Sequence, residues 1–339
     1  MSLIEVESLT KKFKVPIKEP GLKGAIKHLF RPAYREKTAV EQINLNIESG
    51  ESVAYVGPNG AGKSTTIKML TGILVPTSGK VMVNGNSPSK HRIENAKNIG
   101  VVFGQRTQLW WDLPVIESFS LIKDIYEIPA PMYRQNLDRF VELLGLNEFL
   151  HLSARKISLG QRMRADLAAA LLHNPQIVYL DEPTIGLDIA VKERIRRFVK
   201  EMNREQGTTI MLTTHDLEDI EEICRRLIII DHGRIIYDGE LQEMKDLFAQ
   251  ERTIHFQVDE PIKDLHSVIS KLPGVILEND EGTSFSVRFN RFQISAGEIA
   301  GYIMQNGNVS DFHIDEPKID HVIRKLYDGE LVINEGRWA

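Results

Sequence analysis

The stretch "GPNGAGKST", residues 57–65, has the residue types and the spacing of a phosphate-binding loop, G-x-x-x-x-G-K-[ST]. Its glycines let the backbone curl so that several amide groups face one anion. An apolar run, "SVAYV", precedes it and a helical stretch, "TTIKMLTGI", follows it, so the helix dipole adds positive potential at the same point. The pattern predicts a nucleotide site, and the alternative is a glycine-rich turn that binds nothing.

Within this loop, Lys63 is expected to reach the β- and γ-phosphates, and the hydroxyl of Ser64 is expected to ligate Mg²⁺. The predicted nucleotide contacts from the loop are Gly57, Pro58, Asn59, Gly60, Ala61, Gly62, Lys63, Ser64 and Thr65.

A pair of carboxylates, Asp181 and Glu182, ends the apolar run "IVYLDE", and Pro183 follows at once. In a protein with a phosphate loop, the first carboxylate is expected to hold Mg²⁺, usually through water. The second carboxylate could orient or deprotonate the attacking water. The alternative for such a pair is a solvated boundary between a strand and a loop.

The elements that must position these residues alternate between short apolar strands and helical stretches, which predicts an α/β domain with a largely parallel sheet. The strands are expected in "SVAYVG", "AKNIGVVFGQ", "PQIVYLDEP" and "GTTIMLTTHD", and "LIIIDHGRIIYDGE" is expected to form a hairpin that turns at residues 231–234. "LIEVESLT" and "AVEQINLNIESGE" alternate apolar and polar residues, which predicts strands, and a helix is expected near "LQEMKDLFAQ". From about residue 251 the pattern becomes that of a small α+β domain, with helices near 262–271 and 295–305.

Composition sets the broad class of protein. The chain has 339 residues, which favours two domains, and 42% hydrophobic and 26% charged residues, which is ordinary for a globular protein. A net charge of −5 gives no reason to expect nucleic-acid binding, and the single cysteine, Cys224, fits a reducing compartment. No stretch approaches the roughly 20 apolar residues of a membrane span, and the first residues do not form a signal peptide, so we expect a soluble polypeptide.

Three further motifs follow the order of one family. "VVFGQ", "TIGLD" and "TTHD" resemble the Q-loop, the D-loop and the switch region of ABC transporter nucleotide-binding subunits, and the resemblance covers nearly all of residues 1–245. It implies a P-loop NTPase fold with an antiparallel β subdomain and a helical subdomain at about 105–165. It also implies ATP and Mg²⁺ as ligands, Gln105 near the metal and the attacking water, Asp188 at a dimer seam, and His215 at the γ-phosphate.

"ISLGQ", residues 157–161, stands where that family has its signature, "LSGGQ". The resemblance implies that Ser158, Gly160 and Gln161 contact the γ-phosphate bound by a second subunit, with a helix from about Gln161 directing its positive end at this anion. Leu159 replaces a glycine and requires a negative φ. The alternative is an ordinary serine cap on a core helix. Whether two copies pair with each other or with a paralogue stays open.

Several other residues have two interpretations. Phe13 matches a position that stacks on adenine in the family, or is a plain core or surface aromatic, with Phe30 and Tyr34 as competitors. An insertion at about 15–37 belongs to a segment, 11–37, with nine Lys or Arg against two Glu. It is either an amphipathic helix touching lipid or a permease, as in polysaccharide exporters, or a solvated loop. Trp110 and Trp111 are interface anchors or core residues.

The C-terminal part, 251–339, shows no set of residues with metal-ligand spacing. Its four histidines, His255, His266, His313 and His321, are expected to be structural or exposed. By analogy with drug-export relatives, this part is expected to regulate or stabilise the dimer.

Taken together, the sequence predicts an ATPase that powers a separately encoded membrane permease, more similar to exporters than to importers, at the cytoplasmic face of the cell membrane. The rival hypothesis is a soluble ABC ATPase acting on DNA or ribosomes. It is disfavoured because the chain has neither a long coiled coil nor a second phosphate loop.

Overall fold

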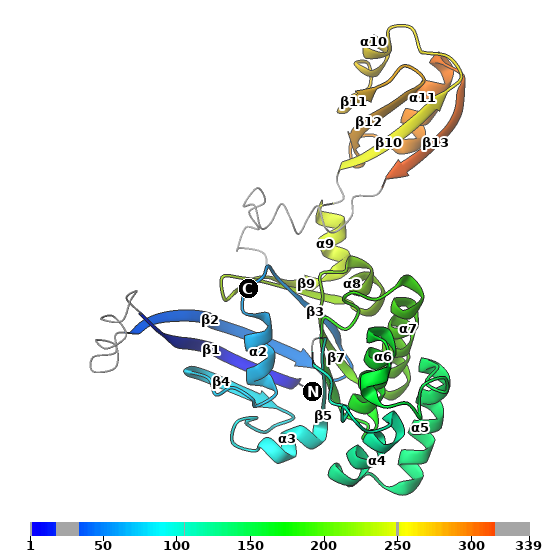
Figure 1. The fold of residues 1–339 in the computed structure, drawn as a ribbon. Helices are drawn as coiled ribbons and strands as arrows, with labels where there is room; N and C mark the ends of the chain where they lie inside the picture. Colours follow the sequence, from blue (N-terminus) through cyan, green and yellow to red (C-terminus); the bar gives the residue numbers. More distant parts are fainter. Residues whose placement is uncertain (1, 18–33, 105, 249–250, 316–339) are drawn as a thin grey trace, which may run out of the picture. The chain divides into compact units, whose positions relative to one another are not determined.

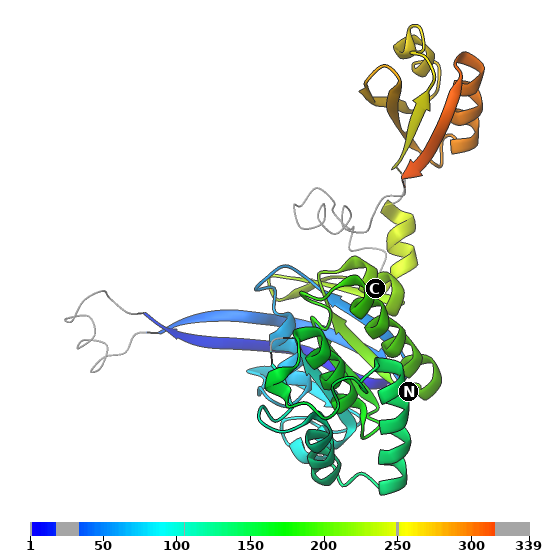
Figure 2. The ribbon, with the colours of Figure 1, turned by 45° about the vertical axis from the view of Figure 1, so that its right-hand side comes forward.

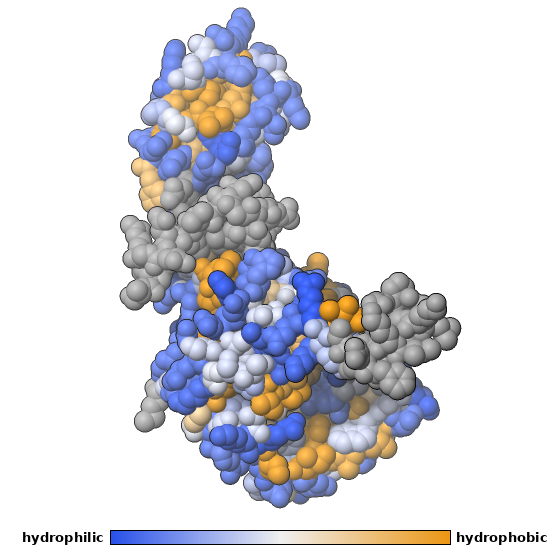
Figure 3. Space-filling model, turned by 90° about the vertical axis from the view of Figure 1, so that its left-hand side faces the viewer, coloured by the Kyte–Doolittle hydropathy of each residue, from blue (hydrophilic) through white to orange (hydrophobic). Residues whose placement is uncertain are grey.

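The structure is a computed structural model that describes residues 2–17, 34–104, 106–248 and 251–315. The chain divides into two compact units, Met1–Gly239 and Glu240–Ala339, which are described separately (Figures 1 and 2). Within the described ranges, no helix is both long enough and apolar enough to cross a membrane. On the face drawn in Figure 3, hydrophobic residues gather into several patches among hydrophilic ones, including one on the second unit.

The first unit is built on a sheet whose six described strands follow the order β5-β6-β7-β3-β8-β9. The pairs β5-β6, β6-β7, β7-β3 and β3-β8 are parallel, as the sequence predicted. The strands are β3 (Ser52–Val56), β5 (Ile99–Phe103), β6 (Ile177–Asp181), β7 (Thr209–Thr213), β8 (Arg226–Asp231) and β9 (Arg234–Glu240). Strands β3 and β7 are buried along their whole length, as expected for a sheet covered on both faces.

The predicted hairpin is present between β8 and β9. Its two connecting residues, His232 and Gly233, have φ values of 45° and 81°. Positive φ at both central positions is the conformation that two-residue hairpin turns favour, because its twist matches that of the strands.

A second sheet of the first unit has the order β2-β1-β4 and is antiparallel. It consists of β1 (Ser2–Pro16), β2 (Tyr34–Glu48) and β4 (Ser78–Val83). Strands β1 and β2 stay paired out to Val15 with Arg35 and Pro16 with Tyr34. The two ends of the predicted insertion, 15–37, are therefore strand rather than loop or helix. The amphipathic helix predicted over its middle lies outside the described residues, as does Phe30.

The helices of the first unit connect these strands (Figure 1). They are α2 (Lys63–Leu70), α3 (Arg92–Asn98), α4 (Val115–Ile125), α5 (Ala130–Leu144), α6 (Leu159–Leu171), α7 (Ile189–Gln206) and α8 (Leu217–Ile223), with a 3₁₀ turn at Ala154–Lys156. Helix α6 packs on α4 and α5 and is buried from Met163 onward. The predicted helical region therefore contains α4, α5 and the start of α6.

The second unit has the element order β-α-β-β-α-β after helix α9 (Leu241–Phe248). Its elements are β10 (Glu251–Val258), α10 (Leu265–Ile269), β11 (Val275–Asp280), β12 (Ser284–Asn290), α11 (Ala296–Asn306) and β13 (Val309–Asp315). The antiparallel sheet has the order β11-β12-β10-β13, which is the ferredoxin-like arrangement. Alternate residues of β10 and β12, including Phe256, Val287 and Phe289, form a core with Ile299 and other residues of the helices, so the unit has its own interior.

Candidate active site

The phosphate loop lies between β3 and α2, at the carboxyl end of a parallel strand. Gly62 has a φ of 114°, and a Cβ there would lie 2.5 Å from the carbonyl oxygen of Ala39. A Cβ on Gly57 would collide with the carbonyl oxygen of Ile230. Glycine is therefore required at 62 by both conformation and space, and at 57 by space alone. Helix α2 begins at Lys63, two residues earlier than the sequence suggested, because Gly62 is its N-cap.

Lys63 is folded back over this loop. Its ammonium donates to the carbonyl oxygens of Gly57, at 2.5 Å, and Pro58, at 3.3 Å, and the residue is only 8% exposed. Burial lowers the pKa of the Lys63 ammonium, and the carboxylates of Glu182 and Asp181 oppose this shift. The cation is thus held against the loop by backbone oxygens that an anionic ligand could replace.

Ser64 and Asp181 lie together, as the sequence predicted. The Ser64 hydroxyl lies 3.3 Å from Asp181 Oδ2, and the Thr213 hydroxyl donates to Oδ1 of the same carboxylate at 2.6 Å. Hydroxyl and carboxylate oxygens are the donors that Mg²⁺ prefers, with water completing its shell. The residues present therefore fit this ion. Gln105, the third predicted metal contact, lies outside the described residues.

Glu182 follows β6 directly and faces His215. Its carboxylate accepts from the backbone amide of His215 and lies 3.3 Å from His215 Nε2. Its φ of 57° is left-handed, which is uncommon for a residue with a side chain and is typical of strained functional positions. Burial raises the pKa of the Glu182 carboxyl, and His215 and Lys63 act to lower it. The geometry suits a proton acceptor.

These residues share one cavity of about 720 Å³. The predicted residues that line it are Phe13, Pro58, Asn59, Gly60, Gly62, Lys63, Ser64, Thr65, Asp181, Glu182 and His215. Several further lining residues were not predicted as site residues, namely Val15, Lys37, Ile73, Phe103 and Arg106. Gly57 and Ala61 are not among the lining residues, and Ala61 is buried. Phe13 is partly exposed at this cavity, with the Lys11 ammonium 5.3 Å from its ring centre, whereas Tyr34 is not among the lining residues.

The segment at 157–161 does not line this cavity. Ser158 is the N-cap of α6, which begins at Leu159 rather than near Gln161 as predicted. The Ser158 hydroxyl accepts from the Gln161 amide at 3.2 Å, and the Gln161 side chain accepts from the Ser158 amide at 2.9 Å. This capping box explains the serine and the glutamine three residues later, and it leaves Ser158 and Leu159 exposed. Leu159 is the first residue of this helix and has the negative φ expected of a residue with a side chain.

Gly160 and Asp188 lie close to this cap in the same chain. A Cβ on Gly160 would lie 3.5 Å from the side chain of Val191, so α6 and the start of α7 are in close contact. The Asp188 carboxylate caps α7 by accepting from the Val191 amide at 2.9 Å and remains exposed. Gly160 and Asp188, which are both predicted to lie at the dimer interface, are therefore close to one another at the surface.

Comparison with known proteins extends these observations. A family model described as "ABC transporter" matches residues 40–185. The uncharacterized ABC transporter ATP-binding protein YhcH of Bacillus subtilis is 32% identical over 247 residues, which are 71% of this chain and 79% of that protein. This chain belongs to the ATP-binding subunits of ABC transporters. The methionine import ATP-binding protein MetN 2 of Enterococcus faecalis is 29% identical over 282 residues, 80% of this chain and 76% of its own.

A solved dimeric ATP-binding cassette in a post-hydrolysis state, bound to ADP and Pi, matches with a TM-score of 0.59 at 26% identity, over 70% of this chain and 98% of that one. The P-loop fold class predicted from the sequence is confirmed. As an ABC ATP-binding subunit, the protein binds and hydrolyses ATP, and subunits of its family dimerise and work with membrane permeases.

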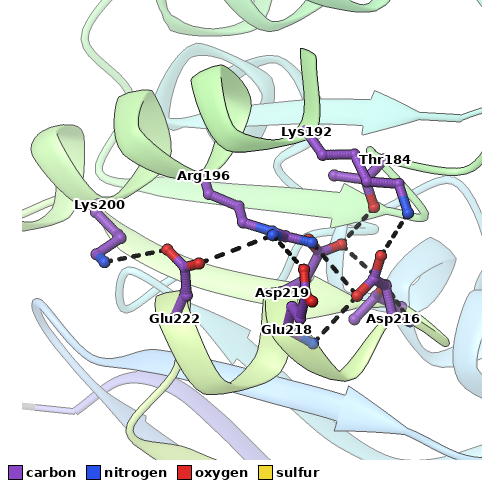
Figure 4. A network of polar contacts seen from close by, with 9 residues as sticks. Thr184, Lys192, Arg196, Lys200, Asp216, Glu218, Asp219 and Glu222 are labelled. Atoms are coloured by element: carbon purple, nitrogen blue, oxygen red, sulfur yellow. Dashed lines mark hydrogen bonds and ion pairs between the residues drawn. The ribbon is translucent and has the colours of Figure 1, made fainter. Parts of the chain in front are cut away.

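In this ABC subunit, a buried network that the sequence did not reveal joins the segment after Glu182 to the segment after His215 (Figure 4). Arg196 of α7 donates to Asp219 of α8 at 2.6 Å, and both side chains are almost fully buried. The second oxygen of Asp219 accepts from the hydroxyls of Thr184 and Thr214. The network therefore holds the backbone next to Glu182 and His215 in place.

A second unpredicted link joins the signature helix of the ABC subunit to the residues after position 105. The Asp166 carboxylate accepts from the Thr107 hydroxyl and from the Gln108 amide, each at 2.9 Å. Burial raises the pKa of Asp166 to about 6. Nearby, Trp110 and Trp111 are 39% and 49% exposed, and the Arg162 guanidinium lies 4.5 Å from the Trp111 ring centre. Neither tryptophan is a core residue.

Proposed function

We propose that two copies of this chain close around two ATP molecules, and that this closure drives a separately encoded membrane permease. In each site the phosphate loop of one copy would hold the nucleotide and the "ISLGQ" segment of the other copy would cap it. One observation carries the proposal: the cap at Ser158 is exposed and lies outside the cavity that contains Lys63 and Glu182. A second copy can supply the "ISLGQ" segment, which the cavity of one chain lacks.

The dimer is proposed to be a homodimer because the sequence of this chain holds both halves of such a site. Lys63 and the loop amides bind phosphate, and the first turn of α6 offers exposed amide groups and a positive helix end to a γ-phosphate. Within the capping box the Ser158 hydroxyl accepts from Gln161, so its proton is free to be donated outward. No paralogue is needed to complete this set.

Hydrolysis is assigned to Glu182 as the group that orients and deprotonates water, with His215 positioned by it at the γ-phosphate. The left-handed backbone at Glu182 and the contact with His215 support these roles. Ser64 and Asp181, with Gln105, would hold Mg²⁺, which neutralises phosphate charge when bound. Phe13 is proposed to stack on adenine, since it is the described aromatic residue at the cavity that also matched the family position.

The permease is proposed to contact the region of Trp110 and Trp111. Two half-exposed tryptophans beside an arginine are the residue types that dominate protein interfaces. Docking there would place the chain at the cytoplasmic face of the cell membrane. The proposed direction of transport is export, on the resemblance of the basic segment and the domain order to export-type subunits. The proposed domains are an ATP-binding domain, 1–245, and an accessory domain, 251–339.

Purification of the chain from gently solubilised cells, followed by reconstitution with its co-purifying permease into proteoliposomes, tests the proposal. With the ATPase on the outside, export from a cell corresponds to movement of cargo into the vesicle. We expect the permease to stimulate ATP hydrolysis and cargo to accumulate inside when ATP is added outside. Release of pre-loaded cargo would reverse the direction, and stimulation by DNA or ribosomes but not by a permease would contradict the transport role.

Trp111→Ala should weaken capture of the permease while leaving the basal ATPase of the isolated chain unchanged, because this ring is not at the nucleotide cavity. Leu152→Ala is a matched control, since Leu152 is a comparably exposed apolar side chain of the same unit. Equal capture by both variants would contradict docking at the tryptophans.

A further inference from the structure

Two histidines that are far apart in the sequence lie face to face in the second unit. His255 of β10 pairs with His313 of β13 in the antiparallel register. Their rings are stacked, with centroids 4.6 Å apart and an angle of 13° between the planes. Asp315 lies two residues beyond His313 on the same strand, so its side chain is on the same face of the sheet. This corrects the expectation of scattered histidines with no ligand set.

The side-chain atoms of these residues converge. His255 Nε2 lies 3.1 Å from Asp315 Oδ2, and His313 Nε2 lies 3.9 Å from Asp315 Oδ1. One ligand atom from each residue lies within 4.8 Å of the other two. Ligand atoms of a tetrahedral zinc site with bonds of about 2.0–2.2 Å are about 3.3–3.6 Å apart, so small side-chain rotations would suffice. All three side chains are reachable from solvent, with exposures of 35%, 70% and 64% for His255, His313 and Asp315.

The surroundings of the three residues add a further polar group. His255 pairs on its other side with Ser286 of β12, which is only 2% exposed. Its hydroxyl has no hydrogen-bond partner within the described part of the chain. Cross-strand neighbours are about 5 Å apart, so this hydroxyl adjoins the His255 side. Among the described residues it is therefore an unpaired polar group on the face of the sheet that carries the two histidines.

We propose that His255, His313 and Asp315 bind Zn²⁺, with water as the fourth ligand. Two imidazoles and one carboxylate suit zinc, whereas Mg²⁺ prefers oxygen ligands alone. The ion would tie β13, an edge strand, to β10 across the register pair. The site belongs to the second unit and does not depend on the proposed ATPase roles.

Zinc binding is tested on the full-length chain without an affinity tag, free of nucleotide, at neutral pH. Competition with a chromogenic chelator measures the affinity and stoichiometry, and Co²⁺ substitution adds a visible spectrum diagnostic of tetrahedral N/O coordination. We expect one ion per chain at these residues. His313→Ala and Asp315→Asn should each weaken binding by at least about tenfold. His266→Ala removes an exposed histidine of the same unit and should leave the affinity unchanged.

Asp315→Asn is nearly isosteric and keeps one oxygen acceptor. It therefore tests zinc binding at these residues even where His313→Ala perturbs folding. Far-UV circular dichroism without metal checks both variants. An absence of binding at micromolar Zn²⁺ would overturn the proposal. So would unchanged zinc affinity in both folded site variants, or a loss of affinity in His266→Ala as large as theirs.

Discussion

The buried pair of Arg196 and Asp219 permits a quantitative prediction. Asp219 is fully buried, and its oxygens accept from Arg196 and from two threonine hydroxyls. Asp219→Ala therefore leaves a guanidinium without its nearest carboxylate and two hydroxyls without their acceptor. Removing one partner of a buried ion pair costs about 3–5 kcal/mol in free energy of unfolding. Arg196 keeps Glu218 at 2.8 Å and Asp216 at 3.4 Å, so the lower end, about 3 kcal/mol, is expected.

Arg196→Met leaves the Asp219 carboxylate buried with only hydroxyl donors beside it, and about 4 kcal/mol is expected. In the double variant neither charge is left alone. The double variant should therefore lose at least about 2 kcal/mol less free energy of unfolding than the two single variants lose in sum. Glu218→Ala is the control. It removes an exposed partner of the same guanidinium and should cost less than about 1 kcal/mol.

Urea unfolding in a Trp338→Phe background measures these energies, because the two remaining tryptophans, Trp110 and Trp111, both lie in the first unit. ATP turnover of the folded Asp219→Ala protein should also fall, since Thr184 and Thr214 lie next to Glu182 and His215, the proposed catalytic residues. If the losses of the two single variants add up to the loss of the double variant within about 0.5 kcal/mol, the account of a coupled buried pair is refuted.

Three other perturbations have defined outcomes. Glu182→Gln should lower ATP turnover by roughly 10²–10⁴-fold yet retain ATP binding and give an ATP-dependent dimer on gel filtration; turnover near wild type would remove Glu182 from its role. Phe13→Ala should raise the Kd for ATP about fivefold or more, with Tyr34→Ala as an unchanged control, and equal effects of the two would contradict adenine stacking. Asp166 binds its proton more tightly in the folded state, at a pKa of about 6. Its contribution to the stability of the fold is therefore fully present below its unfolded pKa and is lost as pH rises through about 6. Relative to Asp166→Asn, the wild type should lose about 2.4 kcal/mol between pH ~4 and ~7, and a flat difference would contradict this shift.

The central strands and the loop between β3 and α2 were predictable because local sequence determines them. Short apolar runs bounded by glycine, proline or carboxylates mark buried parallel strands, and their polar ends gather at one edge of the sheet. Lys63, Ser64, Asp181 and Glu182 could therefore be placed together from the sequence. The predicted start of α6, near Gln161, is two residues late, because Ser158 is the N-cap of this helix as well as a predicted phosphate contact. One residue can do both.

Contacts that depend on strand order or helix pairing were not predictable. His255 and His313 meet only because β13 pairs with β10 at the edge of the sheet. The 57 residues between them do not predict that pairing. The spacing of His313 and Asp315 was a local signal, although a weak one without its partner. Likewise, Arg196 and Asp219 lie on two helices whose facing sides follow from packing.

Mixing two inactive variants tests the shared-site account most directly. Lys63→Ala disables the phosphate loop of one chain and Ser158→Arg disables the cap of the other, so each homodimer has two defective sites. If the sites form between chains, a mixed dimer contains one site built from an intact loop and an intact cap. Subunit exchange at equal concentrations should restore up to about a quarter of the wild-type sites, and ATP hydrolysis should appear on mixing. Continued inactivity of verified mixed dimers would show that loop and cap do not meet across the dimer.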